Sequence, residues 1–81
     1  MKVRVRLFAL ARQLAGAESI DVDLPDGASV RQLRDELQRT CPSLASLLPT
    51  MMIAVNEEYA VDSSRIPPGA AVAVIPPVSG G

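Results

Sequence analysis

The sequence predicts an α+β fold in which one main helix packs on one face of a mixed four- to five-stranded sheet. Near both ends of the chain, apolar and polar residues alternate, as in strands with one buried face. A single amphipathic stretch of about three helical turns lies between these segments. The chain has 81 residues, 48% of them hydrophobic, which suits one small packed core and argues against disorder.

The first segment with strand periodicity reads KVRVRLF over residues 2–8. The alternation directs one set of side chains toward the core, namely Val3, Val5 and Leu7. The other set points away from the core, namely Lys2, Arg4, Arg6 and Phe8. A short helical segment follows and should end at Gly16, because glycine is favoured just after a helix C-terminus. Residues 19–24 alternate again, which predicts a second strand that pairs antiparallel with the first.

The main helix is predicted to begin after Ser29, which has the residue type of an N-cap. Gln32 lies three positions later, as in a capping box. The buried stripe of this helix is expected to contain Val30, Leu33, Leu37 and Cys41. Pro42 should end the helix, and the apolar run at residues 43–48 should make one further helical turn. We interpret Cys41 as a small buried apolar residue and not as a reactive thiol.

Three more strands are predicted: a buried strand at residues 51–55, a short edge strand at 59–61 and a last strand at 70–75. The small side chains of the last strand suit a central position in the sheet. Parallel pairing with the first strand would account for the helical crossover between them. This arrangement is the β-grasp, or ubiquitin-like, fold. We expect one β-grasp domain over residues 1–75 and an extended tail over residues 76–81 that ends in Gly-Gly.

The composition argues against several function classes. A net charge of −1 and only two aromatic residues make nucleic acid an unsuitable partner. The chain has no histidine and a single cysteine, which excludes Ser-His and Cys-His catalysis and a structural zinc site. No segment approaches the length of a membrane span, and the N-terminus does not have the pattern of a signal peptide. We therefore expect no bound metal or cofactor, no membrane partner and, because a lone cysteine suits a reducing compartment, a cytoplasmic location.

The C-terminal run PPVSGG, residues 76–81, adds nothing to a packed core. Pro76 and Pro77 favour an extended path, along which six residues span at most about 20 Å. Gly80 and Gly81 lack a Cβ and therefore suit a slot in another protein that admits only backbone. The group delivered there would be the terminal carboxylate of Gly81. An ATP-dependent enzyme could activate this group as an acyl-adenylate, for conversion to a thiocarboxylate or for joining to a lysine. The alternative is a frayed terminus without function.

Three segments resemble the small, sulfur-carrying subunits of molybdopterin synthase: RLFALARQLAG (residues 6–16), AVNEEYA (54–60) and AVAVIPPVSGG (71–81). The resemblance covers essentially the whole chain. It implies that a ubiquitin-activating-like adenylyltransferase uses ATP to adenylate Gly81, which then becomes a thiocarboxylate. It also implies that the tail enters the large subunit, where sulfur passes to a cyclic pyranopterin monophosphate to build the dithiolene that holds molybdenum. The tail residues that would insert with Gly81 are Pro76, Pro77, Val78, Ser79 and Gly80. The chain would be no enzyme on its own, but the sulfur-donating subunit of a complex.

A docking surface is expected on the face of the sheet that points away from the core. Phe8 and Ile75 have outward parity on the first and last strands, so they should lie close together if these strands are neighbours. Tyr59, on the nearby edge strand, is expected to join them. Exposed apolar patches of this kind usually mark partner sites, and the resemblance places hydrophobic partner contacts at matching positions. Arg12 matches another position of the family near this surface, although a surface arginine is usually only solvated.

Three alternatives remain open. The sulfur carrier for thiamine thiazole synthesis also ends in Gly-Gly, but such carriers tend to be shorter and the double proline suits the molybdopterin type better. A ubiquitin-like protein modifier would use the same terminus, although a chain whose only lysine is Lys2 is poorly equipped to build polymers of itself. The third alternative is a β-grasp interaction module whose tail has no function.

Overall fold

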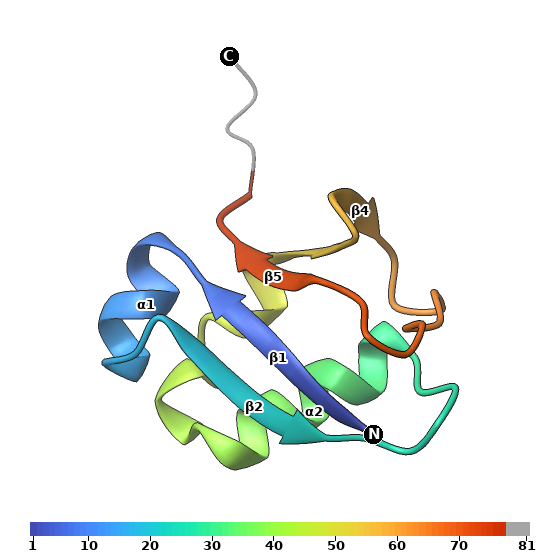
Figure 1. The fold of residues 1–81 in the computed structure, drawn as a ribbon. Helices are drawn as coiled ribbons and strands as arrows, with labels where there is room; N and C mark the ends of the chain where they lie inside the picture. The colour runs from blue at the N-terminus through green and yellow to red at the C-terminus, as the bar shows by residue number, and fades with distance from the viewer. Residues whose placement is uncertain (78–81) are drawn as a thin grey trace.

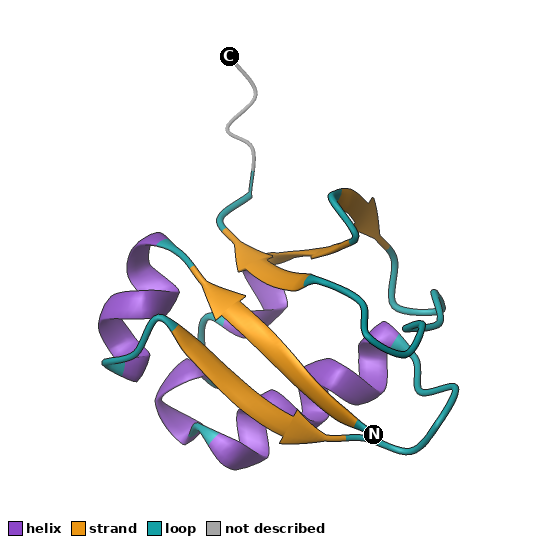
Figure 2. Ribbon diagram, viewed as in Figure 1, coloured by secondary structure: helices purple, strands orange, loops and turns teal. Residues whose placement is uncertain are grey.

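The computed structural model describes residues 1–77 of the chain. The sheet has five strands in the order β2-β1-β5-β3-β4, and the main helix lies across one face of it (Figure 1, Figure 2). The strands are β1 (Lys2–Leu7), β2 (Ser19–Asp23), β3 (Met52–Val55), β4 (Glu58–Ala60) and β5 (Val72–Ile75). The helices are α1 (Ala9–Ala15), α2 (Val30–Thr40) and the 3-10 helices η1 (Pro42–Leu44) and η2 (Leu48–Thr50). The predicted α+β class and β-grasp arrangement are confirmed.

The centre of the sheet is the parallel pair β1–β5. In this pair Val5 lies opposite Val72 and Leu7 opposite Val74. The other neighbouring strands pair antiparallel. Because β1 and β5 run in the same direction, they end at the same edge of the sheet, and the chain leaves the domain from that edge after β5 (Figure 1). The parallel pairing that the helical crossover predicted is thus present.

The core lies between α2 and the face of the sheet that α2 covers, which we call the inner face. Strand side chains exposed by 5% or less form this face, namely Val3, Val5, Leu7, Val22, Ile53, Val72 and Val74. The helix contributes Val30, Leu33 and Leu37, none of which has exposed surface. Each such aliphatic side chain stabilises the fold by about 1.5–3 kcal/mol when buried. The inner face and its helix are therefore the main source of stability.

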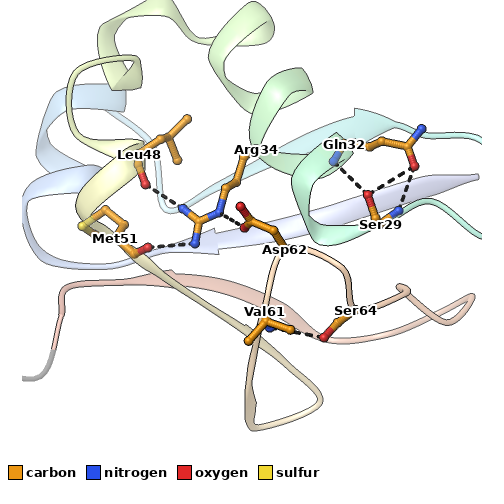
Figure 3. A network of polar contacts seen from close by, with 8 residues as sticks. All are labelled: Ser29, Gln32, Arg34, Leu48, Met51, Val61, Asp62 and Ser64. Carbon is orange, nitrogen blue, oxygen red and sulfur yellow. Dashed lines mark hydrogen bonds and ion pairs between the residues drawn. The ribbon is translucent and has the colours of Figure 1, made fainter.

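The two ends of α2 follow from local chemistry. At the start, the backbone N–H of Gln32 donates to Oγ of Ser29 at 3.2 Å, and the backbone N–H of Ser29 donates to Oε1 of Gln32 at 2.9 Å (Figure 3). The predicted capping box is thus present. At the other end the helix stops at Thr40, and Cys41 is its C-cap residue before Pro42. Both ends lie within one residue of the positions that the sequence predicts.

Several predictions about burial and local structure need correction. Cys41 is half-buried and not buried, because it lies where the chain turns away from the core, and its Sγ is 3.2 Å from Oγ of Ser43. Within β3 only Ile53 is buried. Met52 and Ala54 point to the uncovered face of the sheet, and Val55, the last residue of the strand, is half-buried. The apolar run at residues 43–48 does not form one helical turn; η1 and η2, each with a proline in its first turn, divide the segment after α2.

One arginine of α2 joins three separate segments (Figure 3). The guanidinium of Arg34 donates to the carbonyl of Leu48 at 2.6 Å and to the carbonyl of Met51 at 3.0 Å. Its Nε donates to Oδ1 of Asp62 at 2.9 Å. The side chain of Arg34 is 21% exposed, so these bonds are partly shielded from water. Arg34 therefore holds η2, the approach to β3 and the loop after β4 against the main helix.

Within residues 1–77, none of the helices combines the length and the apolar character that crossing a membrane requires.

Candidate functional site

The face of the sheet opposite α2, which we call the outer face, is not covered by any of the helices in residues 1–77 (Figure 2). Strand pairing places one row of outward residues across all five strands. In order, the row is Tyr59 on β4, Ala54 on β3, Ala73 on β5, Arg6 on β1 and Ser19 on β2. The two alanines are half-buried, whereas Tyr59 and Arg6 are exposed. At the middle of the row, the surface is therefore formed by two small methyl side chains, and the larger side chains of Tyr59 and Arg6 lie on either side of them.

Phe8 and Ile75 lie at the end of this face, beside the point where the chain leaves the domain. Because Leu7 pairs with Val74, the next position along the parallel pair brings Phe8 alongside Ile75. Ile75 is half-buried and also lies opposite Met52 of β3. Phe8 is 37% exposed. The structure therefore brings together the two residues that the parity argument paired, and it adds Met52, which only the strand register could reveal.

The backbone fixes the direction of Phe8. This residue keeps extended dihedral angles, φ −128° and ψ 157°, so its side chain follows the outward parity of β1. The next residue, Ala9, has φ 53°, in the left-handed region, and turns the chain into α1. A residue with a Cβ pays roughly 1–2 kcal/mol for this conformation. The strained turn therefore comes directly after the aromatic residue of the outer face.

Arg6 lies next to Phe8 on the same face. Its guanidinium carbon is 5.3 Å from the centroid of the Phe8 ring, which is within the range of a cation–π contact. Two other arginines border the same region. Arg4 forms an ion pair with Asp21 at 3.1 Å, and Arg12 forms one with Glu18 at 2.7 Å. The hollow beside the aromatic ring is therefore lined by three arginines.

Tyr59 is on the outer face as predicted, but it does not adjoin Phe8. It is 58% exposed on the edge strand β4. Strands β3 and β5 lie between β4 and β1. Three strand spacings of about 4.8 Å therefore place the backbone of Tyr59 roughly 14 Å from the backbone of Arg6. Tyr59 and Phe8 thus flank the alanine centre from opposite sides, and the expected patch is wider than one contiguous cluster.

The start of the predicted tail is exposed. Pro76 and Pro77 both lie on the surface directly after Ile75. The other tail residues named from the sequence, which are Val78, Ser79, Gly80 and Gly81, lie outside the described residues. The geometry of the site therefore comprises the outer face and the first two residues of the tail.

The comparison with protein families gives one match of high coverage. Residues 5–81 match the model of the ThiS family. A molybdopterin synthase sulfur carrier subunit of Arabidopsis thaliana is 37% identical over 81 residues, which is 100% of this chain and 84% of that protein.

Solved structures agree with this match. SAMP1 of Haloferax volcanii, a small archaeal modifier protein, superposes with a TM-score of 0.86 at 29% identity and covers 100% of both chains. A chain from the complex of subunits 1 and 2 of the molybdopterin-converting factor of Helicobacter pylori superposes with a TM-score of 0.71 at 26% identity, again with 100% of both chains covered. The likeness thus extends to a protein named as a modifier and to one solved in a two-subunit complex. The family model and the full-length relatives together confirm the resemblance found in the sequence: the chain belongs to the ThiS family of β-grasp proteins, alongside the sulfur carrier subunits of molybdopterin synthase.

Proposed function

We propose that this chain is the sulfur carrier of a molybdopterin synthase, with its tail as the sulfur-bearing segment and its outer face as the docking surface. The observation that supports this most is the parallel β1–β5 pair. It sets Phe8 beside Ile75 at the same edge from which Pro76 and Pro77 lead away. A protein that bound the outer face would therefore lie next to the start of the tail.

The chemistry would take place at the carboxylate of Gly81. A carboxylate is a poor electrophile, and transfer of AMP from ATP to one of its oxygens, with release of pyrophosphate, supplies a good leaving group. A sulfur nucleophile then displaces AMP and leaves a thiocarboxylate on the chain. In the last step sulfur passes to the cyclic pyranopterin precursor, and an oxygen from water restores the carboxylate. ATP is consumed by the activating enzyme, and the carrier itself needs no bound cofactor or metal.

Two protein partners follow from this proposal. The first is the large subunit, which would receive the tail residues Pro76 to Gly81; the solved two-subunit complex from Helicobacter pylori supports a partner of this kind. The second is a ubiquitin-activating-like adenylyltransferase, which would load Gly81. On this account the chain is not an enzyme by itself, and its partners include neither nucleic acid nor a membrane. The cytoplasm, where ATP and reduced thiols are available, is the proposed location.

The proposal is tested by loading the purified chain with sulfur. The chain is incubated with the activating enzyme, ATP and a sulfur source, and its intact mass is measured. We expect a mass change equal to one oxygen replaced by one sulfur. A variant that lacks Gly80 and Gly81 serves as the control, since it should keep the stability of the domain within about 0.5 kcal/mol and take up no sulfur. An unmodified mass under complete conditions would contradict the proposal.

A protein modifier is the second candidate, favoured by the likeness to SAMP1 over 100% of both chains. It predicts isopeptide conjugates between Gly81 and lysines of other proteins. Mass spectrometry of a lysate from the source cells, searched for such conjugates, would separate the two functions. Conjugates that persist when molybdopterin synthesis is blocked would support the modifier function. A complete absence of conjugates would exclude that function. A sulfur carrier for thiamine thiazole synthesis would be distinguished by the acceptor: its sulfur would pass to a thiazole precursor and not to the pyranopterin.

A further inference from the structure

Among residues 1–77, Arg6 is the one arginine of the outer face that has no ion pair. The neighbouring arginines have acidic partners, since Arg4 pairs with Asp21 at 3.1 Å and Arg12 with Glu18 at 2.7 Å. Within the described part of the chain, Arg6 has no such ion pair, and its contact is the face of the Phe8 ring at 5.3 Å. Its positive charge is therefore held in place by an aromatic ring without being neutralised.

The surroundings of Arg6 form a hollow on the surface. Its lining includes Arg4, Arg6, Phe8, Arg12, Glu18 and Ser19. Three cations and one carboxylate thus converge there, and Asp21, which pairs with Arg4, brings the sum of these charges to about one positive charge. The hollow offers an anion a net attraction without any rearrangement of the chain.

The position of Arg6 means that a docking partner covers it. Arg6 lies in the row with the half-buried Ala73, directly beside Phe8 and one strand away from Ile75. A protein that contacts Phe8 and Ile75 therefore also removes the guanidinium of Arg6 from water. Desolvating a charge without a partner is strongly unfavourable. An interface on this face thus has to provide a countercharge at Arg6.

We propose that the large subunit places one aspartate or glutamate carboxylate against Arg6 in this hollow, and that this ion pair selects and orients the partner on the outer face. The inference rests on the proposed function. It adds that Arg6 is a recognition residue and that the group it binds on the partner is a carboxylate. The guanidinium of Arg6 is planar and carries N–H donors in the fork geometry that a carboxylate accepts with both oxygens.

The test measures the dissociation constant between the full-length chain and the purified large subunit by calorimetry. Arg6→Gln should weaken binding about 10- to 100-fold, because it removes a charge-assisted hydrogen-bonded pair, and Arg6→Glu should weaken it further. Lys2→Gln is the matched control, since Lys2 is on the same strand and face but is not among the residues that line the hollow, and it should change binding by no more than about threefold. Thermal unfolding of each variant verifies that the fold is intact.

Charge reversal then identifies the partner residue. One Asp→Lys or Glu→Lys substitution in the large subunit should restore binding to the Arg6→Glu chain while weakening binding to the unaltered chain. The association rate of the unaltered pair should also fall more steeply with salt than that of the Arg6→Gln pair. Failure of every such substitution to rescue Arg6→Glu would overturn the inference.

Phe8→Ala separates this inference from the proposed function. If Phe8→Ala weakens binding and Arg6→Gln does not, the docking face stands and the role of Arg6 is wrong. If neither substitution affects binding, the large subunit does not dock on the outer face, and the docking part of the proposed function is wrong as well.

Discussion

The inner and outer faces of the sheet are built from alternate residues of the same strands, yet they differ in almost every physical respect. In β1, the inner residues Val3, Val5 and Leu7 are exposed by 5% or less, whereas the outer ones are charged and exposed. In β5 the inner residues are valines and the outer ones are Ala73 and Ile75, both half-buried. The inner face supplies stability by excluding water. The outer face keeps an aromatic ring, small residues and an unbalanced cation accessible, as a recognition surface requires.

Because of this difference, substitutions on the two faces should have separable effects on stability and on binding. An inner-face change should lower the free energy of unfolding and affect binding only through loss of the fold. An outer-face change should alter binding and leave the fold nearly intact. Each of the following predictions tests one side of this separation.

The largest loss of stability is expected from Leu37→Ala. Leu37 of α2 has no exposed surface, so truncation leaves a cavity against the inner face and should lower the free energy of unfolding by about 2–5 kcal/mol. Urea unfolding followed by circular dichroism measures the change. Tyr59→Ala, on the outer face and 58% exposed, is the control and should change stability by less than about 1 kcal/mol. Equal losses in the two variants would mean that the faces do not differ as described.

A smaller loss is expected from Arg34→Met, which keeps the apolar stem of the side chain but removes the guanidinium donors. The carbonyls of Leu48 and Met51 and the carboxylate of Asp62 would lose their partner, at a cost of about 1–3 kcal/mol. The free energy of unfolding gives the result. Arg39→Met is the matched control on the same helix, because Arg39 is exposed and forms an ion pair with Glu36 at 3.3 Å on the protein surface. The loss of stability in this variant should stay below about 1 kcal/mol.

Phe8→Ala should separate binding from stability. The ring is 37% exposed, and its removal should lower the free energy of unfolding by about 1 kcal/mol or less. Binding to the large subunit should weaken at least about tenfold, as is usual for an aromatic hot-spot residue of an interface. Calorimetry with the large subunit measures this effect. Loss of the folded state would instead show that Phe8 belongs to the core and that the outward assignment is wrong.

The smallest effect is expected from Ala9→Gly. Ala9 has φ 53°, and glycine adopts this conformation without steric cost, which should raise the stability by up to about 1 kcal/mol after the greater entropy of the unfolded chain is included. The midpoint of urea unfolding detects a change of this size. Ala11→Gly is the control in the same helix, where φ is ordinary and the side chain is buried, and it should lower the stability. A loss in both variants would argue against strain at Ala9.

The elements that local patterns specify were predictable from the sequence. The alternation in β1, the capping box of Ser29 and Gln32, and the stop at Pro42 each depend on residues that are close in the chain. The β1–β5 pairing was expected because the small side chains of the last strand suit a central position and because parallel pairing accounts for the helical crossover. That pairing is also what made the neighbouring positions of Phe8 and Ile75 predictable.

Features that depend on long-range geometry were not predictable. The bonds of Arg34 reach carbonyls 14 and 17 positions away, and no local pattern marks a carbonyl as an acceptor. Met52 joins Ile75 only through the β3–β5 register. The distance between Tyr59 and Phe8 depends on the strand order, which parity alone does not give. The roles assigned to Val78, Ser79, Gly80 and Gly81 stay predictions, since they concern chemistry on residues outside those described.

The most direct test of sulfur carriage is a single-turnover reaction. The thiocarboxylated chain is mixed with the large subunit and the cyclic pyranopterin precursor in the absence of ATP and of any other sulfur source. The account predicts that the carrier returns to its unmodified mass while the precursor gains sulfur in equal amount. A thiocarboxylate that persists beside an unchanged precursor, although the two proteins form a complex, would contradict it.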